Sequence, residues 1–304
     1  MAAFTFAVIV GFPAAVGGVA ALVLALFALG FGNGVLGVLM NCQAVRLERS
    51  WGKPIMASFH AASSAGGLIG SVSGSLANEA RINPCVHLTV VAGILAVLAL
   101  CADPFLITGP SVPISNGLSL PTVMALPLGL LAFCDLFCEG TVADWSAVYL
   151  HNSKHVTAML AGMGYASFAI AMTTGRMAGD ALSSRFGPRR LVRVAGGLTF
   201  IGVAITLLGR TILPIVSGFA IMGLGLSIVF PKAISATGRQ NPGRTEPAVA
   251  AVSTLGYLGF LVGPPLVGFL AQATNMTFAL GSTLLCSFGI LLFSRALPPD
   301  DYSG

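Results

Sequence analysis

Charge is what this sequence has least of: only 8% of its 304 residues are charged, whereas 56% are hydrophobic. A soluble protein has roughly 25% charged residues, because charged side chains cover its surface. So low a charge content excludes a soluble globular fold, and lipid must be the solvent for most of the chain. The net charge of +5 therefore does not indicate nucleic-acid binding, since basic residues in such a chain follow membrane topology.

Motifs for cofactor and enzyme chemistry are also lacking. There is no GxxxxGK[ST] phosphate loop, so ATP is not expected as the energy source. The six cysteines form no CxxC pair and no disulfide framework, and we interpret them as small apolar residues that bind no metal. Segments 70–74 and 178–180 resemble intramembrane protease motifs only in part, because the required histidine or preceding glycine is missing. We expect neither a cofactor nor enzymatic activity.

Long apolar runs take the place of these features. A membrane-spanning helix needs ~20 apolar residues, and the sequence predicts an all-α polytopic membrane protein with about nine full spans. A shorter apolar segment at 2–16 predicts one partial span. The predicted full spans are 19–40, 55–77, 86–106, 120–150, 156–178, 191–208, 212–230, 248–271 and 278–293.

The basic residues predict the orientation of these spans. With the C-terminus placed in the cytoplasm, 12 of the 15 lysines and arginines fall on the cytoplasmic side, and Arg81, Lys154 and Arg210 fall outside. Such an excess follows the positive-inside rule. The segment ITGPSVPISNG, rich in proline, glycine and serine, is typical of a linker. We therefore expect an N-terminal bundle at 1–106, a cytoplasmic linker at 107–119 and a C-terminal bundle at 120–304.

Two stretches indicate an internal duplication. FALGFGNG, which begins at Phe27, resembles FAIMGLGLS, which begins at Phe219, and a second pair of stretches repeats at nearly the same offset. Parallel repeats of this kind are typical of transporters. On this offset the N-terminal bundle lacks the counterparts of two helices. We expect a fragment, a misplaced start or a natural short form.

The segment FCDLFCEGTVADWSAVYL at 133–150 carries carboxylates inside a predicted span. Asp135 and Glu139 are four residues apart and share one face of a helix, whereas Asp144 lies on the opposite side. Acidic residues within a membrane normally face a bundle interior or a wet cavity, and a carboxyl group with an acidic neighbour can exchange protons near neutrality. We interpret the pair as a solute or proton site; a structural polar contact between helices is the alternative.

Three further polar residues within predicted spans are candidates for the same site. They are Asn33, Asn41 and His60. Each could bind solute or relay a proton, and each could equally form a hydrogen bond between helices. The residues alone do not separate the two interpretations.

The segment GRMAGDALSSRFGPRRLVR at 175–193 follows a predicted span on the cytoplasmic side. Its glycines permit tight turns, and its acid can pair with an arginine near helix ends, where the pair would latch neighbouring helices. This segment resembles the loop motif of the major facilitator superfamily. The residues expected to form the conformational latch are Gly179, Asp180, Arg185, Gly187 and Arg189.

Other stretches resemble one branch of that superfamily. Residues 41–67 and 139–150 are similar to fucose-permease-like proteins, particularly the YbjJ-type permeases, and 256–271 is similar to the eleventh helix of the superfamily. The resemblance implies two six-helix bundles around a central cavity, with this chain holding part of helix three and helices four to twelve. Sugar–proton symporters of this branch carry an acid on the first helix, and residues 1–47 contain none.

The resemblance implies a secondary active transporter in a bacterial inner membrane that works by alternating access. Its partners would be the lipid bilayer and a small polar solute, a sugar being one candidate, moved with or without a proton. Efflux of amphipathic compounds is a second interpretation. A truncated product that transports nothing is a third, because part of one bundle's cavity wall would be absent.

Overall fold

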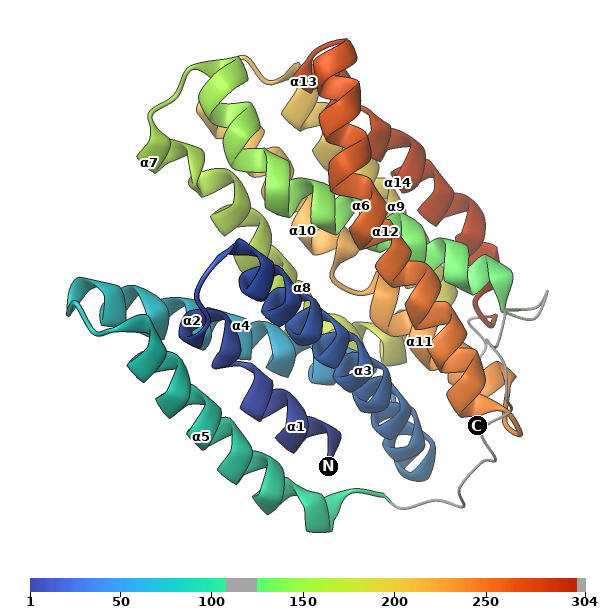
Figure 1. The fold of residues 1–304 in the computed structure, drawn as a ribbon. Coiled ribbons are helices and arrows are strands. Elements are labelled where there is room, and N and C mark those ends of the chain that lie inside the picture. The colour runs from blue at the N-terminus through green and yellow to red at the C-terminus, as the bar shows by residue number, and fades with distance from the viewer. Residues whose placement is uncertain (108–124, 300–304) are drawn as a thin grey trace. The chain divides into compact units, whose positions relative to one another are not determined.

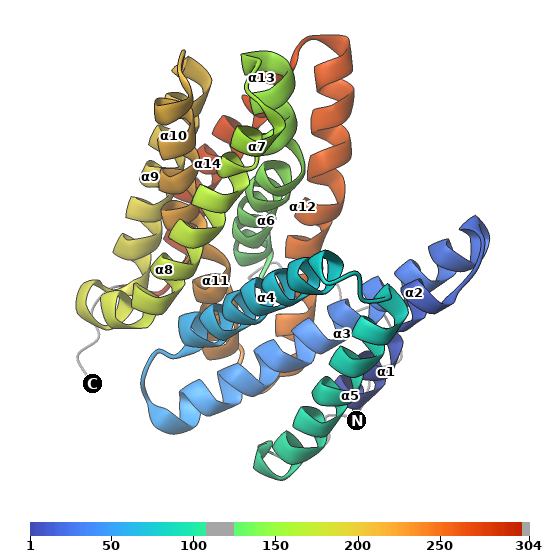
Figure 2. The same ribbon diagram turned by 90° about the vertical axis from the view of Figure 1, so that its left-hand side faces the viewer.

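A computed structural model describes residues 1–107 and 125–299, and every regular element in these residues is a helix. The all-α prediction is therefore confirmed. The chain divides into two compact units: Met1–Leu47 with Ser63–Pro113, and Glu48–Ala62 with Ile114–Gly304. Figures 1 and 2 show the helices from two directions.

The first unit contains the N-terminal helices and parts of two longer ones. Its elements are α1 (Ala2–Ile9), α2 (Phe12–Ala15), α3 (Val19–Trp51), α4 (Met56–Glu79), α5 (Pro84–Ala102) and η1 (Asp103–Phe105). Helices α1 and α2 pack against α5. The short helices α1 and α2 take the place of the predicted partial span. The last turn of α3 and the first turns of α4 belong to the second unit.

The second unit contains the remaining helices, arranged around α6. Its elements are α6 (Leu126–Val148), η2 (Tyr149–Ser153), α7 (Ala158–Ala161), α8 (Met163–Phe186), α9 (Pro188–Leu208), α10 (Ile212–Leu226), α11 (Val229–Gln240), α12 (Thr245–Ala273), α13 (Met276–Leu280), α14 (Ser282–Phe293) and η3 (Ser294–Ala296). Helix α6 lies beside α12, as Figure 1 shows, and also contacts α14, α8 and α11. Its polar side chains therefore face other helices on several sides.

Glycine allows the closest of these helix contacts. A methyl group at Gly259 of α12 would overlap the carbonyl oxygen of Phe133 in α6, and one at Gly223 of α10 would overlap that of Phe168 in α8. Small residues let helix backbones approach closely in lipid, where the hydrophobic effect does not drive helices together. These two contacts let α12 pack closely against α6, and α10 against α8.

Helix lengths agree with the predicted spans. Seven helical segments in the described residues are long and apolar enough to cross a membrane. Helices α4 and α8 have 24 residues each, which is also sufficient, although they are more polar. The chain is therefore an integral membrane protein.

Two boundaries differ from the prediction because polar residues continue a helix beyond its apolar part. The predicted span 212–230 is divided at Ser227 and Ile228 into α10 and α11, and α11 extends to Gln240. Helix α8 extends to Phe186, where Gly187 at φ 79° ends it, as its predicted turn requires.

The predicted division into bundles at 1–106 and 120–304 stays a prediction. The linker at 107–119 lies outside the described residues except for Ile107, whose carbonyl accepts hydrogen bonds from Gln43 and Arg46. The segment Glu48–Ala62, which the sequence analysis assigned to the N-terminal bundle, groups with the second unit. The reason lies in its hydrogen bonds, described below.

Candidate functional site

Asp135 lies in the middle of α6 and is completely buried. Its Oδ2 accepts a hydrogen bond of 3.2 Å from the backbone N–H of Phe230, the second residue of α11. Its Oδ1 has no hydrogen-bond partner among the described residues. The first N–H groups of a helix have no partner within that helix, so Asp135 satisfies one of them at the break between α10 and α11.

Glu139 lies one turn further along α6 and forms an ion pair with Arg176 of α8. Oε2 of Glu139 is 3.4 Å from Nη2 of Arg176, and the two side chains are 20% and 12% exposed, respectively. Two carboxylates and one guanidinium thus gather between α6 and α8. The prediction that Arg176 lies in a cytoplasmic loop is wrong, because α8 continues past it by ten residues.

His60 reaches the same region from α4. It is buried, and the edge of its ring meets Phe230 with the centroids 5.5 Å apart. The ring of Phe230 in turn stacks on Tyr257 of α12 at 6.1 Å. One residue, Phe230, therefore contacts His60 through its ring and Asp135 through its backbone.

Asn33 and Asn41 lie on the part of α3 that belongs to the first unit. Asn33 is exposed and Asn41 is fully buried. Their role in solute binding stays a prediction.

A second group of charges surrounds the start of α4. Asp180 of α8 accepts hydrogen bonds from the backbone N–H groups of Ala57 and Ser58, at 3.1 and 2.7 Å, and from the hydroxyl of Ser58. Lys232 of α11 donates to the same carboxylate at 3.0 Å. A negative charge at a helix N-terminus is favoured by the helix dipole, so Asp180 ties α4 and α11 to α8.

Glu48, at the end of α3, completes the cap on α4. Its Oε2 accepts from the N–H groups of Ile55 and Met56, at 3.0 and 3.1 Å. Its Oε1 accepts from Ser235 and, at 3.2 Å, from Arg239, both on α11. Four successive N–H groups at the start of α4 are thus bound by two carboxylates, which explains why Glu48–Ala62 groups with the second unit.

The pKa of Asp180 follows from these contacts. Asp180 lies beyond the predicted apolar part of α8, which ends at residue 178. Burial would raise its pKa, but the Lys232 ammonium and the hydrogen bonds from Ser58 outweigh burial and hold the pKa below its ordinary value. The carboxylate is therefore ionised at neutral pH.

The predicted pairing of Asp180 with Arg185 is wrong. Lys232 is the cation on Asp180, whereas Arg185 lies over the ring of Phe186 at 5.3 Å. Arg189 donates to the carbonyls of Leu297 and Arg295, so it holds the C-terminal end of the described chain. Sequence spacing favoured Arg185 because it is near in the chain, whereas the actual partner comes from another helix.

The tight turn expected at Gly179 is wrong, because Gly179 lies inside α8, where it allows close packing instead. A methyl group there would lie 2.8 Å from Cγ2 of Ile228 and 2.9 Å from Cβ of Ala57. Only a residue without a side chain lets α8 approach both the start of α4 and the α10–α11 break.

Sequence reasoning missed Glu48, Lys232, Ser235 and Arg239. The last three are spaced three and four residues apart in α11, which places them on one face of that helix. A polar face that follows an apolar span was the signal that could have found them.

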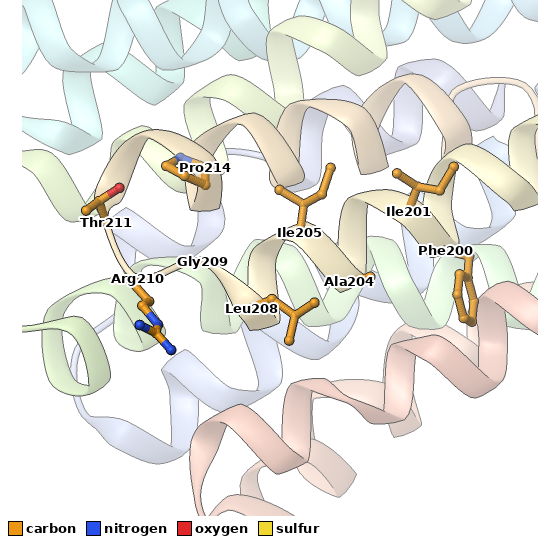
Figure 3. A pocket seen from close by; sticks show the side chains of 9 residues that line it. All are labelled: Phe200, Ile201, Ala204, Ile205, Leu208, Gly209, Arg210, Thr211 and Pro214. Carbon is orange, nitrogen blue, oxygen red and sulfur yellow. The ribbon is translucent and has the colours of Figure 1, made fainter.

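A groove of the second unit is separate from these charges. It has a volume of about 490 Å³ and lies between α9 and α10, where Phe200, Ile201 and Leu208 line it and Arg210 is its only charged residue (Figure 3). No carboxylate lines it, so it does not add to the cluster around Asp135.

Known proteins are similar to this chain along most of its length. The model of the Major Facilitator Superfamily matches residues 128–303. An uncharacterized MFS-type transporter of Yersinia pestis is 34% identical over 280 residues, which cover 91% of this chain and 73% of that protein. The membrane protein MosC of Rhizobium meliloti is 32% identical over 253 residues, which cover 83% of this chain and 62% of that protein.

A solved structure has the same fold. A crystal structure of the fucose:proton symporter FucP of E. coli superposes with a TM-score of 0.73 at 17% sequence identity, over 97% of this chain and 82% of that one. The family and the fold are those of transporters. The chain belongs to the major facilitator superfamily.

Proposed function

We propose that this protein is a proton-coupled secondary transporter of a small polar solute, with a sugar as the first candidate. The ion pair between Glu139 and Arg176, next to the buried Asp135, is the observation that supports the proposal most. Charged residues inside membrane helices are costly and usually mark the path of a substrate or an ion. The fold shared with a fucose:proton symporter is consistent with a sugar.

The charges around Asp135 favour coupling to a proton. Asp135 and Glu139 can carry two negative charges, whereas Arg176 supplies one positive charge near them, so one negative charge remains when both are ionised. A proton on one of the two carboxylates would compensate this charge while the site is closed to water on both sides of the membrane. Hydroxyl groups of the solute would form hydrogen bonds with Glu139 and Arg176 in place of the bond between these two side chains. Carboxylates accept and guanidinium groups donate such hydrogen bonds.

The charges at the start of α4 would serve as the conformational latch. Asp180 with Lys232, and Glu48 with Arg239, form in the state described here and would separate when the site opens to the other side of the membrane. Ion pairs between helices are typical of elements that change partners during switching. Gly179 and Gly187 permit the close contact and the turn, whereas Arg185 and Arg189 have other partners.

We further propose a bacterial inner-membrane location with the C-terminus in the cytoplasm. Without Arg176, which lies within α8, 11 basic residues on the predicted cytoplasmic side against three outside support this orientation.

Uptake of radiolabelled sugars into proteoliposomes, with and without an inward proton gradient, tests the transport function. Glu139→Gln should reduce gradient-driven uptake by about tenfold or more, because one lost hydrogen bond between charged groups is worth ~1.5–3 kcal/mol. Asp144→Asn is the matched control, since Asp144 is an exposed acid of the same helix, and it should keep uptake. Unchanged uptake in the Glu139 variant would remove Glu139 from the mechanism.

A further inference from the structure

The break between α10 and α11 connects the cluster around Asp135 with the group of charges at the start of α4. Ser227 and Ile228 interrupt a single membrane span of 29 residues, Ile212–Gln240. The N-terminus of α11 is therefore created inside the bundle, and the N–H of Phe230 there binds Oδ2 of Asp135 at 3.2 Å. Discontinuous membrane helices place their half-helix ends at binding sites in other transporters.

Helix α11 extends from this contact with Asp135 to the ion pairs of the latch. It has 12 residues, and Lys232 follows Phe230 by two positions. Lys232 is 2% exposed and binds Asp180, while Ser235 and Arg239 bind Glu48. A short rigid helix thus has a carboxylate of α6 at its start and the two carboxylates that cap α4 along its side.

Asp135 differs in its partners from the other carboxylates of the two groups of charges. Glu139 has Arg176, Asp180 has Lys232 and Glu48 has Arg239, whereas no ion pair involving Asp135 occurs among the described residues. Its Oδ1 is buried without a hydrogen-bond partner in the described chain. The charged and titratable groups around it are Glu139 and Cys134 on α6, Arg176 on α8 and, across the ring of Phe230, His60 on α4.

We propose that α11 transmits the protonation state of Asp135 to the latch at the start of α4. An ionised Asp135 attracts the positive end of α11 and holds the helix where Lys232 and Arg239 reach their partners. A proton that arrives from water binds Oδ1, removes this attraction and lets α11 shift, which loosens both ion pairs. On its release to water the attraction returns. This inference rests on the proposed proton coupling and identifies the group that binds the proton.

Hydrogen–deuterium exchange of the full chain in nanodiscs tests the proposal without any solute. The amides of Ile55, Met56, Ala57 and Ser58 report on the latch directly, because Glu48 and Asp180 bind them. After correction for the intrinsic pH dependence of exchange, their protection should fall on the order of tenfold as Asp135 becomes protonated, the range of a charge at a buried helix end. Amides of α12 serve as the reference.

Two variants identify the group responsible. Asp135→Asn keeps an oxygen for the Phe230 N–H but carries no charge, so the four amides should exchange fast at every pH. Asp144→Asn removes an exposed acid of the same helix, leaves Asp135 and Glu139 in place and should keep the pH-dependent step. In Lys232→Ala the latch lacks one ion pair, so the four amides should exchange fast at all pH values. This variant provides the reference exchange rate for an open latch.

A pH-independent wild type, or a step that survives in Asp135→Asn, would overturn the proposal. The wild-type titration is decisive by itself should the asparagine variant fail to fold. Solute uptake without any pH response of these amides would contradict the role of α11 and leave transport standing. A pH response without uptake would contradict transport and leave the role of α11 standing.

Discussion

At the scale of single residues, charged side chains inside the second unit form ion pairs with side chains from other helices. Glu139 has Arg176, and the buried Lys232 has Asp180. Removal of one partner from such a pair leaves the other charge in a poorly solvated place, which costs more than the pair contributes. Loss of the cation from either pair should therefore lower stability.

We expect Arg176→Gln to lower stability by about 1–3 kcal/mol, because Glu139 keeps its charge and loses its partner. Thermal unfolding in detergent measures the loss. The double variant with Glu139→Gln should recover most of it, since residue 139 then carries no charge that lacks its partner. A double variant as unstable as the single one would show that the pair is not what Arg176 contributes.

Gly179→Ala is the second prediction at this scale. The added methyl group would lie within 3 Å of Ile228 and Ala57, so α8 must move away from α4 at a cost of about 1–3 kcal/mol. Gly197→Ala in α9 is the control, because nothing lies within 4 Å of the new methyl group. Thermal unfolding should show the control within about 1 kcal/mol of wild type, shifted toward higher stability by the helix propensity of alanine.

At the scale of the elements, the start of α4 depends on carboxylates that other helices supply. Asp180 comes from α8 and Glu48 from the end of α3. Helix N-termini usually find their acceptor in a neighbouring residue of the chain. Here the cap is tertiary, so α4 begins correctly only when α3, α8 and α11 are in place.

Asp180→Asn should lower stability by about 1–3 kcal/mol at neutral pH, because the amide cannot pair with Lys232. The pKa of Asp180 is depressed, so its contribution is full above the ordinary value of 3.8 and is lost as the pH falls through the lower value in the folded protein. The stability difference between wild type and variant should therefore stay constant from pH 7 to pH 5. A difference that grows toward low pH in thermal unfolding would contradict this sign.

At the scale of the whole molecule, the distribution of basic residues predicts one orientation in the membrane. Arg193 of α9 and Arg210, between α9 and α10, are both exposed and lie near opposite ends of one span. In cells, a thiol reagent that does not cross membranes should label Arg210→Cys from outside and reach Arg193→Cys only after permeabilisation. Replacement of the native cysteines avoids background. Labelling in the reverse order would invert the predicted topology.

Composition and apolar run length predicted the membrane fold, and the paired acids of α6 pointed to its polar site. These features are local: an apolar run of about 20 residues must cross lipid as a helix whatever its neighbours are. The spacing of Asp135 and Glu139 places them on one helix face for the same reason. The predicted turn at Gly187 also follows from a local need, a positive φ that glycine adopts without strain.

Partner choice was decided by the tertiary structure alone. Arg176 meets Glu139 and Lys232 meets Asp180 across 37 and 52 residues of chain, and no spacing rule reaches that far. The division of one apolar span into α10 and α11, with Asp135 at the break, was likewise invisible in a continuous hydrophobic run. Hydropathy specifies which segments enter the membrane, but the partners of a buried charge depend on which helices pack together.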